Sequence, residues 1–309
     1  MSTPVAGLPH PDGAFGLPAG AWRRFARNPL AVAGAAVLLI FIVLALVAPY
    51  ISPHDPAAVD LLNVNAPPSR AHPLGTDPIG RDILSRLLYG ARISLLVGFT
   101  VAAGAVTVGS LVGAVAGYFG GWADTVLMRL VDVMLSYPSL FLNILVLVLF
   151  GGDFKYLVLI LILNSWMGVA RLVRASFLQL REMPYVEAAR AIGVPTWRIM
   201  LRHLLPGASA PIIVYGTLMV GTAILVESAL SFLGLGVQPP QTSWGQMLFK
   251  AQEYMLTNPW LAVYPGLCIF LTVLAVNFVG DGIRDALDPR QPARIPRRRM
   301  ALWRARLSR

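Results

Sequence analysis

Histidine, lysine and acidic residues are the side chains of this chain that could bind a metal or a nucleotide or transfer a proton. The four histidines are His10, His54, His72 and His203. They show no pair spacing on a helix, no HExxH motif and no Ser-His-Asp arrangement. The only lysines, Lys155 and Lys250, each follow phenylalanine, so no phosphate-binding loop ending in Gly-Lys exists. We therefore expect no metal site, no bound nucleotide cofactor and no catalysis in this chain.

The stretch EAARAIGVPTWRIMLRHLLP, residues 187–206, is rich in arginine and lies between long apolar segments. Pro184 suits the first turn of a helix, where a backbone N–H is not needed, and Gly193 suits the end of one. Pro195 fits the first turn of a second helix. The pattern predicts a short helix, a sharp bend and another helix.

Small and charged residues alternate on the first of these helices. Ala188 and Ala189 have small side chains, so this part of the helix can enter a groove on a partner. Glu187 and Arg190 are three residues apart and lie on one helix face. These features favour a docking element. An ordinary surface loop is the alternative.

Composition places the chain among integral membrane proteins. It has 309 residues, of which 56% are hydrophobic and 13% charged, against roughly 25% charged in soluble domains. About 20 apolar residues span a bilayer as a helix. Four charge-free windows meet this description: 28–54, 93–123, 133–152 and 254–280. Two less clean windows bring the number to six: 156–170, which is short unless it continues to Arg174, and 203–226, which ends at Glu227. The predicted fold is all-α and polytopic, with about six transmembrane helices.

Basic residues predict the orientation. With the N-terminus inside, 19 lysines and arginines fall on inner segments and six on outer ones, as the positive-inside rule requires. Both termini and residues 187–206 are then cytoplasmic. The net charge of +10 is concentrated in the arginine-rich tail 290–309, which we interpret as a contact with anionic lipid and not with nucleic acid. Residues 1–21 are expected to be a disordered tail.

The segment 52–92 is expected outside, with an amphipathic helix near residues 81–88 that could lie in the membrane interface. Glycines at 109, 113 and 117 have the spacing that allows close helix packing. Asp124, Arg129 and Asp132 are interpreted as part of a solvated inner loop. The single cysteine, Cys268, lies in the last apolar window and forms no disulfide within the chain.

Glu227 is the one acidic residue near the interior of an apolar window. A charge at such depth is a candidate functional group. It could lie on a substrate path, or it could anchor the turn formed by residues 228–236. About twenty residues separate it from the inner end of its helix, so a place at the outer interface also stays open.

Four stretches together resemble one family. Residues 72–98 read HPLGTDPIGRDILSRLLYGARISLLVG, residues 227–240 read ESALSFLGLGVQPP followed by SWG at 243–245, and residues 280–290 read GDGIRDALDPR. With the 187–206 loop, they resemble the C-type permease of dipeptide and oligopeptide ATP-binding-cassette (ABC) importers over residues 22–290. His203 departs from the general pattern of the loop, where isoleucine is more common.

The resemblance implies a type I importer permease fold. Residues 22–91 would hold the first transmembrane helix and the outer segment, and 92–289 the permease domain. The loop residues expected to engage an ATPase are Glu187, Ala188, Ala189, Gly193, His203 and Pro206. Expected partners are a second permease, two ATPase subunits or domains that bind ATP and Mg²⁺, an extracytoplasmic binding protein and the lipid bilayer of the cell membrane.

The substrate stays open at this point. Dipeptides or oligopeptides are expected, with nickel or glutathione-like solutes as the alternative for the same machinery. A stand-alone channel or secondary transporter is a rival class, although such proteins usually need intramembrane ionisable relays and this chain offers only Glu227. A membrane enzyme is disfavoured because no cluster of ionisable residues appears.

Overall fold

The computed structural model describes residues 20–287, and the regular elements in this range are all helices. The predictions made for the basic tail 290–309 and for most of the N-terminal tail 1–21 lie outside the described range. The first described helix, α1 (Ala21–Phe25), leads into α2 (Pro29–Ile51). Asn28 caps α2, since its side-chain oxygen accepts from the N–H groups of Leu30 and Ala31 at 3.1 and 3.3 Å.

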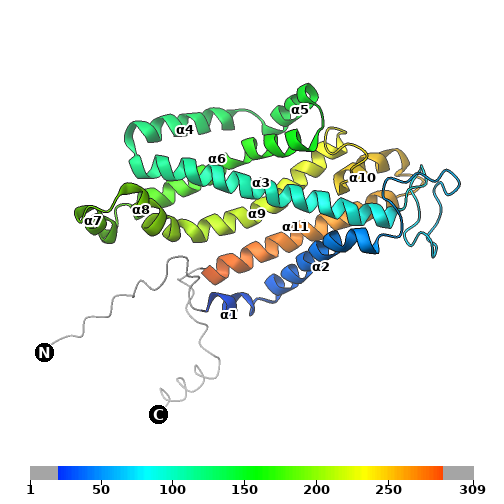
Figure 1. The fold of residues 1–309 in the computed structure, drawn as a ribbon, viewed down its shortest axis with the longest axis horizontal. Helices are drawn as coiled ribbons and strands as arrows, with labels where there is room; N and C mark the ends of the chain where they lie inside the picture. The colour runs from blue at the N-terminus through cyan, green and yellow to red at the C-terminus, as the bar shows by residue number, and fades with distance from the viewer. Residues whose placement is uncertain (1–19, 288–309) are drawn as a thin grey trace, which may run out of the picture.

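Long apolar helices form the bundle (Figure 1). They are α2, α3 (Ile83–Phe119), α6 (Phe154–Leu180), α9 (Leu205–Phe232) and α11 (Trp260–Leu287). Within the described residues, five helical segments are long and apolar enough to cross a membrane, and a bent pair brings the number to six. The prediction of an all-α polytopic fold with about six spans is confirmed. The short helices α7 (Pro184–Ala191) and α8 (Thr196–Ile199) lie at one end, opposite the outer segment 52–82 (Figure 1).

The window 133–152 is not the single straight span that its composition predicted. It is divided between α4 (Gly121–Ser136) and α5 (Ser139–Phe150), which are bent by 80° relative to each other. Pro138 explains the break, because a proline disfavours the helical conformation of the residue before it, and Tyr137 is extended with ψ 137°.

The loop interpretation of residues 124–132 was also wrong. Asp124, Arg129 and Asp132 lie inside helix α4. Arg174 of α6 donates from two of its nitrogens to both carboxylate oxygens of Asp124. Arg171 donates to Asp132 at 2.6 Å. These ion pairs hold α4 on α6, so polar residues here serve helix packing.

The predicted interfacial helix near residues 81–88 is not a separate element. It forms the first turns of α3, which runs without a break for 37 residues. Asp82 caps α3 by accepting from the Ser85 N–H at 2.7 Å. Arg86, which belongs to the polar side of this predicted amphipathic helix, is 3% exposed. It reaches across to α10 (Trp244–Ala251) and donates to Gln246 at 2.9 Å.

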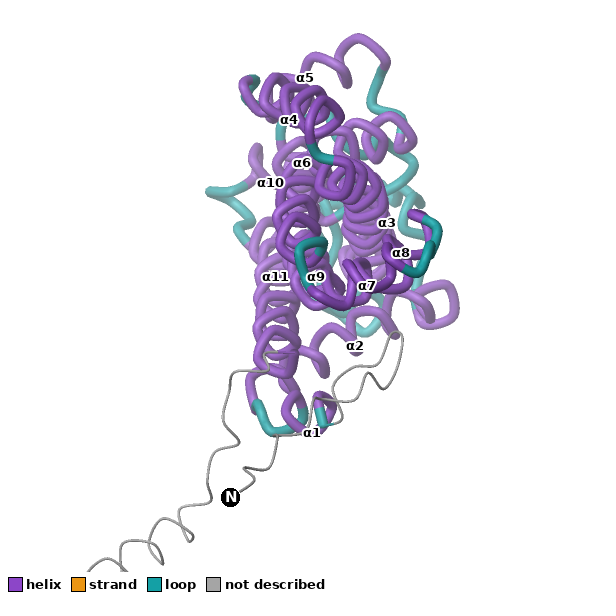
Figure 2. The backbone as a smooth tube through the Cα atoms, turned by 90° about the vertical axis from the view of Figure 1, so that its left-hand side faces the viewer, coloured by secondary structure: helices purple, strands orange, loops and turns teal. Residues whose placement is uncertain are grey.

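Glycines allow α3 and α6 to approach closely, as their spacing predicted. A Cβ added to Gly113 would lie 2.4 Å from the carbonyl oxygen of Ala170, and one added to Gly109 would lie 2.5 Å from that of Trp166. Only a residue without a side chain fits where the facing backbone is this near. Helix α11 packs against α2 and α9 on the other side of the bundle. Figure 2 shows the bundle from the end that carries α7 and α8.

Candidate functional site

The loop 187–206 forms a helical elbow, which we define as α7, the turn at Gly193 and α8. Helix α7 starts with Pro184 in its first turn. At its end the Gly193 N–H donates to the Arg190 carbonyl and the Val194 N–H donates to the Ala189 carbonyl, both at 3.0 Å. This pair of bonds is the Schellman motif, which needs a left-handed residue, and Gly193 has φ +79°. The helix, bend and helix are arranged as the sequence predicted, with Pro195 immediately before α8.

The elbow carries large apolar side chains that the described chain leaves about half exposed or more. Ile192 is 80% exposed, Trp197 59% and Tyr185 48%, and Leu201, just after α8, is 54% exposed. Burial of the Tyr185 ring raises the pKa of its phenol, so it stays protonated at neutral pH. An exposed apolar group on a short helical unit at the end of the bundle is typical of a protein interaction surface.

The other face of the elbow holds it on the bundle. Val186 and Ala189 are buried, while Glu187 and Ala188 remain exposed. The Arg190 guanidinium lies over the Tyr118 ring of α3 at 5.3 Å from the ring centre, a favourable cation–π distance. The loop is therefore attached to the rigid helices, so force on α7 can reach them.

His203 and Pro206 lie where the elbow joins α9. His203 is half-buried in a π-helical turn, Met200–Leu204, and Pro206 occupies the first turn of α9. A π-turn is a local widening that often marks functional positions in helices. Within residues 20–287, the group of side chains with the spacing of metal ligands does not include His203.

A cavity of about 400 Å³ opens between α5, α6 and α9. Its polar lining is contributed by Ser139, Asn143, Asn164, Ser165, Tyr215 and Thr222. Asn164 donates an amide hydrogen to the Asn143 oxygen, and Asn143 is 2% exposed. Polar side chains inside a membrane bundle are costly and commonly line substrate paths. This lining is uncharged, so it offers hydrogen bonds without selecting for a net charge.

Sequence analysis missed this cavity. A signal was available, because Asn143 and Asn164 are amides inside the apolar windows 133–152 and 156–170. Their meeting could not be predicted, since it depends on how α5 folds back against α6 after the break at Pro138.

Glu227 is not among the residues that line this cavity, although its neighbour Val226 is. It is fully buried in the last turns of α9 and accepts hydrogen bonds from Ser231 and Ser243, both at 2.7 Å, and from Ser228 at 3.4 Å. Ser243 is the cap of α10 and also accepts from the Gln246 N–H at 3.2 Å. The carboxylate thus joins α9 to the turn and to α10, which are the contacts expected of an anchor.

Helix α10 is clamped on its other side by α3. The indole N–H of the fully buried Trp244 donates to the Leu87 carbonyl at 3.1 Å, and the Trp244 backbone N–H donates to Ser94 at 3.2 Å. Gly90 leaves room for the indole, since a Cβ there would lie 3.1 Å from the ring. Glu227 and Trp244 therefore hold α3, α9 and α10 together at the end of the bundle opposite the elbow.

A bundle of apolar helices, with an exposed elbow at one end and a neutral polar cavity among its helices, defines a membrane transport subunit of the permease class. Residues 109–291 match the family described as binding-protein-dependent transport system inner membrane component, and residues 19–68 match the N-terminal transmembrane domain of oligopeptide transport permease C. The chain belongs to the binding-protein-dependent transport system inner membrane component family. The resemblance drawn from its four sequence stretches is confirmed.

Relatives with assigned names are similar along most of their length. The chain is 44% identical over 271 residues to the glutathione transport system permease protein GsiD of Pectobacterium atrosepticum, covering 87% of this chain and 90% of that protein. It is 43% identical over 271 residues to the dipeptide transport system permease protein DppC of Bacillus subtilis, covering 87% and 85%. The chain is accordingly a multi-pass permease subunit of an ABC importer.

Proposed function

We propose that this chain forms one half of the translocation path of an ATP-driven importer for short peptides. A second permease completes the path, two ATPase subunits bind ATP and Mg²⁺, and an extracytoplasmic binding protein delivers the substrate. The relatives named for glutathione and for dipeptides support this substrate class, because glutathione is itself a tripeptide with one unusual amide link. The chain itself performs no catalysis.

The elbow is the observation that carries the proposal. It presents Ile192 and Trp197 to solvent at one end of the bundle while Arg190 holds it on α3. When two ATPase subunits close on ATP, a rigid elbow docked on each would move with them. The attached helices would then turn as a body and open the path to the other side of the membrane. Glu187, Ala188 and Gly193 are the docking residues in this proposal. Ala189, which was expected to join them, is 6% exposed and packs against the bundle instead.

The charge distribution supports a cytoplasmic position for the elbow, within reach of the ATPase. Helix α1 packs on α11, and the described chain begins at α1 and ends at α11 on the side of the bundle toward α7 and α8 (Figure 1). An elbow and two cytoplasmic termini on one side agree with the positive-inside distribution. The outer segment 52–82 then faces the binding protein.

The neutral cavity is this chain's share of the path. Asn143 and Asn164 present amide groups that can both donate to and accept from a peptide backbone. Peptides of varied side chains have in common only their backbone amides and termini, so a lining without charge suits passage with little selection. Selection then belongs mainly to the binding protein.

Reconstitution tests the proposal directly. The chain is purified with its second permease and ATPase subunits, placed in liposomes, and supplied with binding protein and either a labelled dipeptide or labelled glutathione. We expect uptake that requires both ATP and the binding protein. Uptake that continues without the ATPase subunits would refute the importer mechanism and favour a stand-alone carrier, and uptake of nickel but of neither peptide would refute the substrate class.

Variants of the cavity sharpen the test. Asn143→Leu and Asn164→Leu should lower peptide uptake several-fold while the complex still assembles and hydrolyses ATP. The matched control is Thr107→Val, because that hydroxyl bonds the Ala103 carbonyl of its own helix at 2.8 Å and lies outside the cavity. Unchanged uptake in both asparagine variants would remove the cavity from the path.

A further inference from the structure

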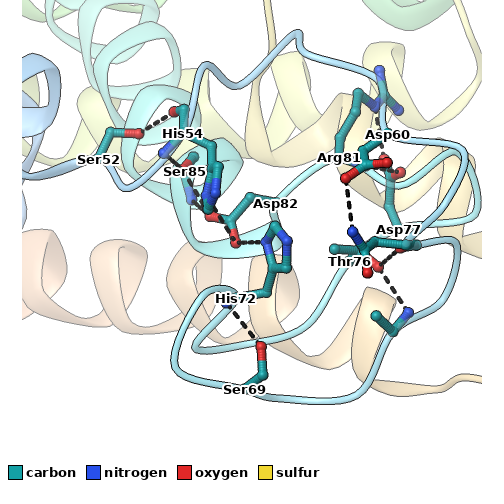
Figure 3. Close-up of polar contacts among 12 residues, drawn as sticks. Ser52, His54, Asp60, Ser69, His72, Thr76, Asp77, Arg81, Asp82 and Ser85 are labelled. Carbon is teal, nitrogen blue, oxygen red and sulfur yellow. Dashed lines mark hydrogen bonds and ion pairs between the residues drawn. The ribbon is translucent and has the colours of Figure 1, made fainter.

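Three residues from separate parts of the outer segment meet at the start of α3 (Figure 3). His54 follows α2, His72 lies in the loop, and Asp82 is the cap of α3. The His72 Nδ1 atom is 3.0 Å from Asp82 Oδ1, and His54 Nδ1 is 4.0 Å from the same oxygen. One potential ligand atom from each residue lies within 4.8 Å of the other two.

Backbone contacts hold these groups in place. The other carboxylate oxygen of Asp82 accepts from the N–H and the hydroxyl of Ser85, both at 2.7 Å, which leaves Oδ1 directed at the imidazoles. The His54 N–H donates to the Ser85 hydroxyl at 3.2 Å, and the His54 carbonyl accepts from Ser52 at 2.7 Å. The His72 N–H donates to Ser69 at 3.0 Å. The three side chains therefore start from fixed backbones.

Electrostatics make a cation the natural occupant. The two imidazole rings are stacked with centres 4.5 Å apart and an angle of 24° between planes. Both Nδ1 atoms face one carboxylate oxygen. Two imidazolium rings at this distance would repel each other, whereas two neutral imidazoles and one carboxylate form a set of two nitrogens and one oxygen. That set suits a divalent transition metal such as Zn²⁺.

The geometry leaves room for such an ion and a path to it. Side-chain exposure rises from 0% for Asp82 through 11% for His72 to 40% for His54. In a tetrahedral zinc site, ligand atoms about 2.0–2.1 Å from the metal are about 3.3 Å apart. The His72–Asp82 pair, at 3.0 Å, is slightly closer than this spacing, and His54 Nδ1, at 4.0 Å from the same oxygen, would have to move closer to complete the set. Water can complete the coordination from the open side.

We propose that His54, His72 and Asp82 bind a divalent transition metal, with Zn²⁺ as the preferred ion. The metal would fasten the outer segment to the first turn of α3, at the end of the bundle opposite the elbow. It would be a structural or regulatory ion, since the site lies apart from the polar cavity. The inference stands on these three side chains and does not depend on the transported substrate.

Direct metal binding tests the proposal. The full chain is purified in detergent with an affinity tag that contains no histidine, in a His10→Ala background, and stripped with a chelator. Zn²⁺ is then measured by competition with a chromogenic chelator, and Co²⁺ by its visible absorption as a tetrahedral stand-in for zinc. We expect one Zn²⁺ per chain, intense Co²⁺ bands, and a higher melting temperature with Zn²⁺.

Two variants and one control decide the outcome. His54→Ala and Asp82→Asn should each weaken Zn²⁺ binding by about tenfold or more and abolish the thermal shift. Asn keeps an oxygen that can cap α3, and His54 is exposed, so both variants should fold. His203→Ala, which removes a histidine outside the cluster, should bind like the parent. Absence of stoichiometric Zn²⁺ binding, or full binding by His54→Ala, would overturn the proposal.

Discussion

Gly193→Ala is the sharpest test of the elbow, because the structure isolates one cause for its effect. Gly193 has φ +79°, and no heavy atom lies within 4 Å of a Cβ placed there. A side chain at this position therefore meets no clash, and the whole cost comes from the left-handed backbone, about 1–2 kcal/mol for an L-residue. Such a cost disfavours the native turn by about 5- to 30-fold.

The assay is the number of peptides taken up per ATP hydrolysed by the reconstituted complex. We expect Gly193→Ala to lower this ratio while the chain still inserts and assembles, since the core of the bundle is unchanged. Gly193→Asn is the matched variant, because asparagine tolerates the left-handed conformation better than alanine. We expect it to lie between the parent and Gly193→Ala.

Three results would refute this reasoning. Equal coupling in the parent and in Gly193→Ala would show that the left-handed turn is not required for the elbow to act. Equal loss in the Asn and Ala variants would show that something other than backbone strain is responsible. Poor insertion of Gly193→Ala, measured as its yield in the membrane, would place the defect in folding and likewise contradict the prediction.

The remaining predictions concern stability in detergent, followed by thermal unfolding. Glu227→Ala removes the acceptor of three buried serine hydroxyls and should lower the free energy of unfolding by about 1.5–3 kcal/mol. Glu227→Gln keeps one acceptor oxygen and should lower it by less. Equal losses of stability in the two variants would contradict the anchor role. Gly113→Ala should lower the free energy of unfolding by about 1–3 kcal/mol, because the added methyl group overpacks against α6. Gly266→Ala is the control: a Cβ added there has no heavy atom within 4 Å, so this variant should be neutral or stabilising. Unchanged stability of Gly113→Ala would disprove the close packing. Arg174→Met breaks the ion pair with Asp124 and should cost about 1 kcal/mol, less at high salt; a loss independent of salt would argue against an electrostatic origin.

The elbow was predictable because its signals are local. Proline restricts the backbone dihedral angles at its own position and glycine extends their allowed range. Pro184 and Gly193 therefore mark a helix start and a helix end whatever surrounds them. The glycines at 109 and 113 gave a second correct prediction, since a small residue every fourth position leaves a groove on one helix face. The partner of that groove, α6, could not be named from the pattern.

Two predictions were wrong for related reasons. One gave apolar composition more weight than a helix-breaking proline, and the other took charged residues as evidence of a loop inside a continuous helix. Pro138 divides the window 133–152, although the window carries no charged residue. Asp124 and Asp132 looked like loop residues because they are charged, yet arginines of α6 neutralise them inside α4. A charged residue in the sequence can belong to a solvated loop or to a helix face that forms ion pairs with another helix. Charge alone does not distinguish the two, because the arginine partners of Asp132 and Asp124 lie 39 and 50 positions away in the sequence.

Composition, proline and glycine positions and motif spacing are properties of neighbouring residues. They were therefore enough to predict the class of this protein, its approximate number of spans, its helical elbow and its family. The folded chain was needed to show that Asn143 contacts Asn164, that Glu227 accepts hydrogen bonds from three serines, and that His54, His72 and Asp82 converge. Each of these sets joins separate segments, and their meeting depends on the packing of whole helices and loops. No periodicity within one segment contains that information.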